Sequence, residues 1–294
     1  MKILTVGSMN LDYVYQVDHI VTPGETEESS SLNVFLGGKG FNQTIALKKA
    51  GATVYHAGLI GEDGQVFLAA CEEYGLSPKY IKTVDESTGH TIIQIDQQAE
   101  NCILLYGGAN QQFTKEYIDG VLADFSKGDI LLLQNEINLL PYIVEVASDK
   151  GMTIALNPSP FNDKLTAVDL SKIDIFILNE VEGQQITGQK NPKAILEAMH
   201  HQFPTAKVML TLGKAGAIYS DQEQTVEQAS FKVAAVDTTA AGDTFTGYFL
   251  AGLIEGLAVR QILTRSAKAS AIAVTRHGAI PSIPTKAEVD AALQ

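Results

Sequence analysis

The stretch VDTTAAGDTF at residues 236–245 decides the fold of this chain and points to its chemistry. An extended, β-branched run stops at two small residues, and Gly242 and Asp243 then open a helix-like segment. A glycine at a helix N-terminus exposes backbone N–H groups that, with the helix dipole, favour an anion. A carboxylate beside an anion is repelled unless it has a role, such as taking a proton from a hydroxyl that attacks a phosphate. The alternative is an ordinary capped helix with Asp243 in its first turn.

Short β-branched runs alternate with longer helical patterns along the rest of the chain, which is typical of parallel βαβ units. The 294 residues suffice for one large α/β domain or two small ones. We predict core strands at residues 3–6, 53–59, 130–133, 153–156, 175–178 and 208–211. We predict helices at residues 42–50, 65–74, 115–125, 140–150, 192–202, 244–255 and 262–274.

Two regions interrupt this alternation. Residues 13–17 and 28–35 have the pattern of strands, and so do residues 89–95 and 101–106, which a polar turn joins. Four short strands with no helix between the last two do not fit a parallel sheet. They predict a small antiparallel sheet that projects from the main domain and serves as a lid over a cleft or as an interface.

The composition limits the possible partners. The net charge of −13 argues against binding to nucleic acid, whose phosphates would be repelled, but not against a nucleotide held by a local anion site. Cys71 and Cys102 lie far from any His cluster, which indicates neither a disulfide framework nor a zinc site. Residues 1–7 are too short and too polar for a signal peptide, and no apolar run reaches the ~18 residues of a membrane span. We expect a reduced, soluble, cytoplasmic protein.

Glycine-rich turns occur at two further places. Residues 37–43, GGKGFNQ, precede a helical pattern, and glycines there let the backbone approach a ligand closely. The spacing matches neither a Walker loop nor a dinucleotide fingerprint. Residues 211–216, TLGKAG, form a turn between strands that suits a backbone loop over a nucleotide. The alternatives are a glycine-rich turn with an exposed lysine and a simple hairpin.

Polar side chains follow three of the predicted strands, where ligands bind in α/β sheets. Asn10 and Asp12 follow the first strand and together offer donors and acceptors for a polyol. Glu136 follows the strand at 130–133. Asn179 and Glu182 follow the strand at 175–178. The alternatives are an Asx turn, a polar strand end and a helix cap, respectively.

The chain contains, in this order, the motifs N-x-D, GGKG-x-N, N-x-x-E and AAGD. They resemble the motifs of the ribokinase-like sugar kinases of the phosphofructokinase B type. The resemblance covers essentially the whole chain, from Gly7 to Pro284. It implies an α/β fold: one three-layer α/β/α domain over residues 1–294, with a mostly parallel central sheet. It also implies a small antiparallel β lid, with strands from about residues 13–17, 28–35 and 89–106.

The resemblance also implies roles for individual residues. Asp243 would be the catalytic base, and the backbone of Ala240, Ala241 and Gly242 would form the anion hole. The residues implied for the sugar are Asn10, Asp12, Gly38, Lys39, Asn42 and Glu136. Those implied for the nucleotide are Asn179, Thr211, Leu212, Gly213, Lys214, Ala215, Gly216, Gly242, Asp243 and Lys268. Three positions depart from the usual family pattern, namely Phe41, Asn135 and Lys268.

The cofactors are expectations from the same resemblance. ATP would be the phosphate donor, with Mg²⁺ organised by Asn179 and Glu182. A potassium ion would lie among Asp237, Thr239, Ala273, Arg276, Gly278 and Ser282, with backbone carbonyls as most of its ligands. The lid would join two copies in a homodimer.

The expected reaction is transfer of the ATP γ-phosphate to the 5-hydroxyl of D-ribose. The alternatives are a kinase of the same family for deoxyribose, a nucleoside or another sugar, and a non-catalytic sugar sensor. A phosphorylated sugar acceptor would need more positive charge, and we find no clear basic cluster beyond Lys39.

Overall fold

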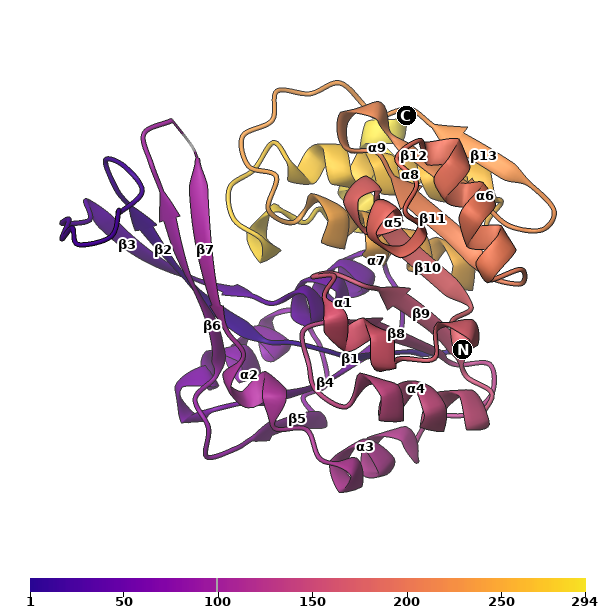
Figure 1. The fold of residues 1–294 in the computed structure, drawn as a ribbon, viewed down its shortest axis with the longest axis horizontal. Coiled ribbons are helices and arrows are strands. Elements are labelled where there is room, and N and C mark those ends of the chain that lie inside the picture. Colours follow the sequence, from indigo (N-terminus) through magenta and orange to yellow (C-terminus); the bar gives the residue numbers. More distant parts are fainter. Residues whose placement is uncertain (99) are drawn as a thin grey trace.

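The computed structural model describes residues 1–98 and 100–294. Within these residues nine strands form a large sheet in the order β13-β12-β11-β10-β9-β8-β1-β4-β5 (Figure 1). All pairs from β11 to β5 are parallel, and β12 and β13 join one edge as antiparallel strands. Their bounds are β1 Ile3–Val6, β4 Val54–Ile60, β5 Tyr80–Thr83, β8 Ile130–Gln134, β9 Thr153–Asn157, β10 Ile175–Asn179, β11 Lys207–Thr211, β12 Ala217–Ser220 and β13 Thr225–Gln228.

Helices cover both faces of the large sheet because its strands are apolar on both sides. In β8, Ile130 and Leu132 face one apolar core, and Leu131 and Leu133 face the other. Helices α1 (Lys39–Lys49), α2 (Val66–Glu73), α7 (Ala241–Ile254), α8 (Val259–Ala273) and α9 (Lys286–Leu293) pack in the first core. Helices α3 (Lys115–Leu122), α4 (Leu140–Asp149), α5 (Glu180–Thr187) and α6 (Pro192–Gln202) pack in the second. The predicted three-layer α/β/α fold is confirmed.

Four more strands form a small sheet in the order β3-β2-β6-β7 within the described residues, and Figure 1 shows it projecting from the main body. Their bounds are β2 Asn10–Gln16, β3 Ser31–Gly37, β6 Gly89–Ile95 and β7 Asn101–Tyr106. Of the predicted segment 89–106, residue 99 lies outside the described residues.

The pairing within the small sheet differs from the prediction in one respect. The outer pairs β2–β3 and β6–β7 are antiparallel as predicted, but the central pair β2–β6 is parallel. The reason is topological, since β2 follows β1 and β6 follows β5 in the chain. Both therefore leave the large sheet at its carboxyl edge and run outward in the same direction.

Several elements escaped the prediction. The strands β5, β12 and β13 have four residues each, too short for a clear alternation. Helices α5 and α9, of eight residues each, were also not predicted, although both begin with a complete capping box. Helix α7 begins at Ala241, three residues before its predicted start, which places Asp243 in its first turn. No helix in the described part of the chain is long and apolar enough to cross a membrane.

Candidate active site

The carboxyl edge of the large sheet and the N-termini of α1 and α7 meet at one place. Helix α7 packs closely on α1 because Gly247 has no side chain; a Cβ there would lie 2.4 Å from the Ala46 side chain. This close approach brings Asn42 and Gln43, in the first half of α1, to Asp243 at the start of α7.

Asp243 is buried, and side-chain amides hold both of its carboxylate oxygens. Asn42 Nδ2 donates to Oδ2 over 3.1 Å, and Gln43 Nε2 donates to Oδ1 over 2.9 Å. Asn42 Oδ1 is buried and has no hydrogen-bond partner among the described residues. A hydrogen-bond donor on a ligand would satisfy this oxygen.

Lys39 lies beside these groups at the start of α1. Burial alone would lower the pKa of its ammonium group, but the carboxylates of Asp243, Glu136 and Glu182 together raise it. Lys39 is therefore a positive charge among three acids.

The glycine-rich turn sits directly on the loop that follows β1. Gly38 has φ +87°, and a Cβ on it would lie 2.9 Å from the backbone of residues 8 and 10. A Cβ on Gly40 would lie 2.5 Å from the Ser8 nitrogen. Glu136 Oε2 joins the two segments, because it accepts hydrogen bonds from the Ser8 hydroxyl and from the Lys39 N–H over 3.0 Å. Burial raises the pKa of Glu136 despite these donors.

The polar pair after β1 points into the same region. Asn10 Oδ1 accepts a hydrogen bond from Asn110 Nδ2 over 2.7 Å, and Asp12 Oδ1 accepts one from the Thr91 hydroxyl over 2.5 Å. Burial raises the pKa of Asp12 to about 6; the Thr91 hydrogen bond opposes this, and the charges of Glu136 and Asp243 add to it. We name as the polar cluster Asn10, Asp12, Lys39, Asn42, Glu136 and Asp243.

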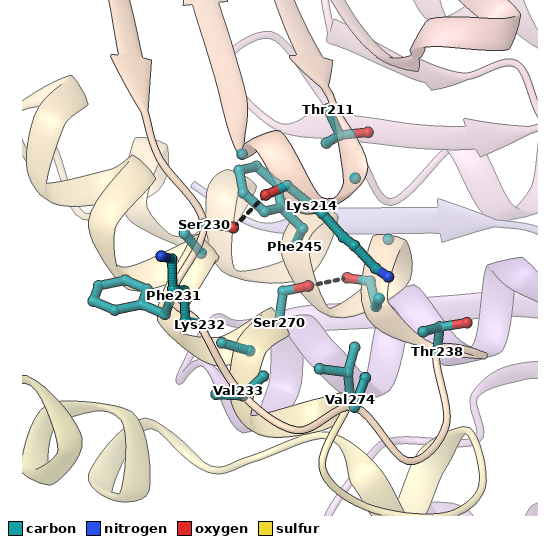
Figure 2. A pocket seen from close by; sticks show the side chains of 17 residues that line it. Thr211, Lys214, Ser230, Phe231, Lys232, Val233, Thr238, Phe245, Ser270 and Val274 are labelled. Carbon is teal, nitrogen blue, oxygen red and sulfur yellow. Dashed lines mark hydrogen bonds between the residues drawn. The ribbon is translucent and has the colours of Figure 1, made fainter.

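A groove of ≈ 710 Å³ lies on the other side of the α7 N-terminus (Figure 2). We call it the large groove. Of the residues predicted for a nucleotide, Thr211, Gly213, Lys214, Gly216 and Gly242 line it. Phe231, Phe245 and Val274, which Figure 2 labels, also line it.

Five residues predicted for the nucleotide are not among those that line the large groove in the described chain, namely Asn179, Leu212, Ala215, Asp243 and Lys268. Of these, Asn179 and Asp243 line a smaller cavity beside it. Leu212 packs at the edge of the second apolar core, and its N–H donates to the Gly216 carbonyl over 2.8 Å. The Lys268 ammonium lies 3.9 Å from the centroid of the Phe231 ring, which does line the groove. Leu212 and Ala215 thus shape the turn, and Lys268 supports an aromatic wall.

A smaller cavity of ≈ 110 Å³ connects the polar cluster with the large groove. Lys39 and Asp243 line it, as does Glu182, and it shares Thr211 and Gly242 with the groove. Asp243 therefore lies where the two regions meet.

Asn179 and Glu182 form a complete capping box on α5, in which each side chain accepts a hydrogen bond from the other residue's N–H over 2.9 Å. Glu182 is nevertheless at the smaller cavity, where burial raises its pKa. Asn179 and Glu182 therefore cap α5 and face the smaller cavity at the same time.

The N-terminus of α7 has no side-chain cap in the described residues. The Ala241 N–H donates to the Thr238 carbonyl over 3.2 Å, so it is not among the N–H groups left for a ligand. Ala240 is buried and precedes the helix, whereas Gly242 is exposed and open to the groove. The first N–H groups of a helix have no carbonyl partner within it, which leaves donors here for an anion.

Hydrogen bonds join three of the residues predicted for a monovalent cation, namely Asp237, Thr239 and Gly278. Asp237 accepts hydrogen bonds from the N–H groups of Thr239 and Gly278, each over 2.9 Å. Burial would raise the pKa of Asp237, but these donors and the Thr239 hydroxyl lower it overall. The side chains of Arg276 and Ser282 turn elsewhere, to Glu288 and to the Ala279 carbonyl, and the Ala273 carbonyl accepts from the Arg276 N–H.

Among residues 1–98 and 100–294, no three His, Cys, Asp or Glu side chains are grouped so as to hold a metal ion.

Comparison with known proteins supplies the family. Residues 1–286 match the pfkB family carbohydrate kinases. The chain belongs to this family. The prediction of a ribokinase-like kinase is thereby confirmed, and with it a carbohydrate kinase that uses ATP.

Individual relatives agree with this membership. The chain is 36% identical to a ribokinase of Haemophilus influenzae, over 98% of this chain and 97% of the relative. It is 28% identical to a deoxyribokinase of Salmonella typhi, over 97% and 96% of the two chains. Among solved structures, it is similar to an Arabidopsis thaliana ribokinase complexed with ribose and ATP, with a TM-score of 0.86, 28% identity and coverage of 100% and 98%.

Five polar residues of this pfkB-family site were not singled out from the sequence: Ser8, Gln43, Thr91, Asn110 and Gln134. Ser8, Gln43 and Gln134 stand next to or near predicted residues, so their place in the motifs was a usable signal. Thr91 and Asn110 carry no local signal, because their contacts to residues 12 and 10 span 79 and 100 positions.

Proposed function

We propose that this chain transfers the γ-phosphate of ATP to the 5-hydroxyl of D-ribose. One observation carries the proposal. Asp243 lines the cavity that connects the polar cluster with the large groove, so a base stands between a place for a sugar and a place for a nucleotide. The similarity to ribokinases over nearly the full length of the chain supports ribose as the acceptor.

In the proposed reaction, Asp243 takes the proton of the acceptor hydroxyl. The resulting oxygen forms a bond to the γ-phosphorus, the bond from that phosphorus to the bridging oxygen breaks, and ADP leaves. The backbone N–H of Gly242, at the exposed start of α7, faces the transferring group and stabilises its negative charge. Lys39 adds a positive charge on the acceptor side.

The rest of the polar cluster binds the sugar in this proposal. Asp12 and Glu136 accept hydrogen bonds from hydroxyls, and Asn10 contributes an amide. Asn42 has a buried Oδ1 without a partner in the described residues, which a sugar hydroxyl can satisfy. Gly38 has to be glycine, because a side chain would strike the loop below it.

ATP fits the large groove by its chemistry. Phe231, Phe245 and Val274 offer apolar surface for a base, while Lys214 and the start of α7 offer positive charge for phosphates. When bound, Mg²⁺ neutralises phosphate charge; Asn179 and Glu182 would hold it through water at the smaller cavity. Potassium is proposed at Asp237 and neighbouring carbonyls, which would fix the loop before α7.

We also propose that two copies associate through the small sheet. This sheet exposes apolar side chains on β3, β6 and β7, and such patches mark interaction sites. They are Leu32, Val34, Ile92, Ile103, Leu104, Leu105 and Tyr106.

The test is an acceptor panel. Purified protein is incubated with ATP, Mg²⁺ and either potassium or sodium, together with ribose, 2-deoxyribose, hexoses or nucleosides, and ADP release is measured. We expect the highest kcat/KM with ribose and formation of ribose 5-phosphate. Preference for 2-deoxyribose would instead indicate that the chain is a deoxyribokinase, like its relative from Salmonella typhi. Ribose binding without ADP release would indicate a non-catalytic sugar sensor and refute the proposal of a kinase.

A further inference from the structure

We propose that Gln43 is the positioning residue for Asp243, and that Gln134 fixes the orientation of Gln43. The inference rests on the proposed function of Asp243 as the base. Gln43 Nε2 donates to Asp243 Oδ1 over 2.9 Å, and Gln134 Nε2 donates to Gln43 Oε1 over 2.7 Å. The three side chains come from α7, α1 and β8 and form one directed chain of hydrogen bonds.

Both glutamines of this hydrogen-bond chain are buried, which limits the partners that their amides can have. Gln43 and Gln134 are each 1% exposed, and buried amides are costly unless they are hydrogen-bonded. Gln134 Oε1 has no partner in the described residues, so the polar contact that the structure gives this side chain is its bond to Gln43. A second contact, from Gln43 Nε2 to Asn157 Oδ1 over 3.2 Å, leaves the amide in the same orientation.

The charge of Lys39 explains why Asp243 needs such a clamp. Lys39 lines the same cavity as Asp243, and Asp243 is the largest of the charges that raise the Lys39 pKa. Even so, the ion pairs found in the described chain do not include Lys39. Asn42 and Gln43 hold one carboxylate oxygen each, and together they keep the base from turning onto the lysine.

A neutral amide suits this task better than a cation would. It fixes the carboxylate by a hydrogen bond while leaving its negative charge available for a proton. Each Asp243 oxygen keeps a further lone pair beside the one that receives its amide. The clamp therefore orients the base toward the cavity without neutralising it.

The first experiment replaces Gln43 by an apolar side chain of similar length, Gln43→Met. We expect kcat to fall about 10- to 100-fold, part of the 10²–10⁴-fold typical of a general base, with the sugar KM within a few-fold of wild type. The matched control is Thr44→Val, the next residue on α1. Its buried hydroxyl bonds to the Gly40 carbonyl and to His56 and does not contact Asp243. This control should lose thermal stability but keep its kcat.

The second experiment separates positioning from a merely structural role. In Gln43→Glu a carboxyl faces Asp243, and two facing carboxyls share a proton. The acidic limb of the kcat–pH profile should therefore move to higher pH, by about one pH unit or more. Circular dichroism and the melting temperature establish that each variant is folded.

The outcomes are distinct. A folded Gln43→Met with wild-type kcat, or a Gln43→Glu profile that does not move, overturns the proposal. If Gln43→Met does not fold, Gln134→Met decides: a smaller fall in kcat at unchanged sugar KM supports the chain, and wild-type kcat overturns it. Wild-type protein that phosphorylates no acceptor would instead refute the proposed function, before any variant is made.

Discussion

The polar cluster and the large groove are built by different means. The cluster consists of buried side chains that hold one another, as Asn42 holds Asp243 and Asn110 holds Asn10. The groove consists of backbone turns and apolar walls, with Lys214 as one of its charged groups. In the cluster, therefore, the chemistry depends on which side chain stands at each position. In the groove, the chemistry depends on the conformation of the backbone.

The largest effect is expected at the junction between the two regions. Asp243→Asn keeps the shape of the side chain but removes the base, so kcat should fall ~10²-fold or more. Ribose binding, measured by calorimetry, should change little, because the other members of the cluster remain. Near-wild-type turnover by this variant would remove Asp243 from the role of base.

The next effect lies within the cluster. Asp12→Ala removes an acceptor of sugar hydroxyls, and hydrogen bonds to charged groups are worth about 1.5–3 kcal/mol, so the ribose KM should rise about 10- to 100-fold. An unchanged ribose KM would place Asp12 outside the sugar contacts.

The pKa of Asp12 adds a pH dependence to this prediction. Since that pKa is raised to about 6, the side chain gains a proton as the pH falls through this value and loses acceptor capacity. The ribose KM should therefore increase below about pH 6 and be lowest above it. In Asp12→Asn this dependence should disappear; if it persists, another group such as Glu136 is its source.

Two glycines of α7 sharpen the comparison by separating stability from activity. A Cβ at Gly247 would lie 2.4 Å from Ala46, so Gly247→Ala should push α7 from α1 and cost about 1–3 kcal/mol. A Cβ at Gly242 meets no atom of the described residues within 4 Å, so Gly242→Ala should melt like wild type. Since it crowds the groove, it should instead raise the KM for ATP. Thermal melts and ATP kinetics on both variants test this contrast, and equal melting temperatures would refute the packing argument.

The same difference explains what the sequence could predict. The AAGD and GGKG motifs singled out Asp243, Lys39 and Asn42, and the structure brings these three residues together, because side-chain chemistry leaves a signature in the sequence. In the groove, the sequence predicted Leu212 and Ala215 for the nucleotide, and the structure places both in the turn but not among the residues that line the groove. Gln43 was missed although it stands beside Asn42 in the same motif, because its contact with Asp243 follows only from the packing of α1 on α7.

The fold shows a similar limit. The long parallel strands and the amphipathic helices were predictable from local patterns. The parallel pairing of β2 with β6 was not, because it follows from where two distant strands leave the large sheet.

The smallest effect is expected at Lys268, which was predicted to bind the nucleotide. Its ammonium lies over the Phe231 ring, and a cation–π contact at an exposed or half-exposed site is worth about 0.5–1 kcal/mol. Lys268→Ala should therefore raise the KM for ATP only about two- to fivefold, at unchanged kcat and ribose KM. Phe231→Ala removes the wall itself and should raise the KM for ATP more. If Lys268→Ala has the larger effect, the lysine contacts the nucleotide directly, and side-chain chemistry matters in the groove as it does in the cluster.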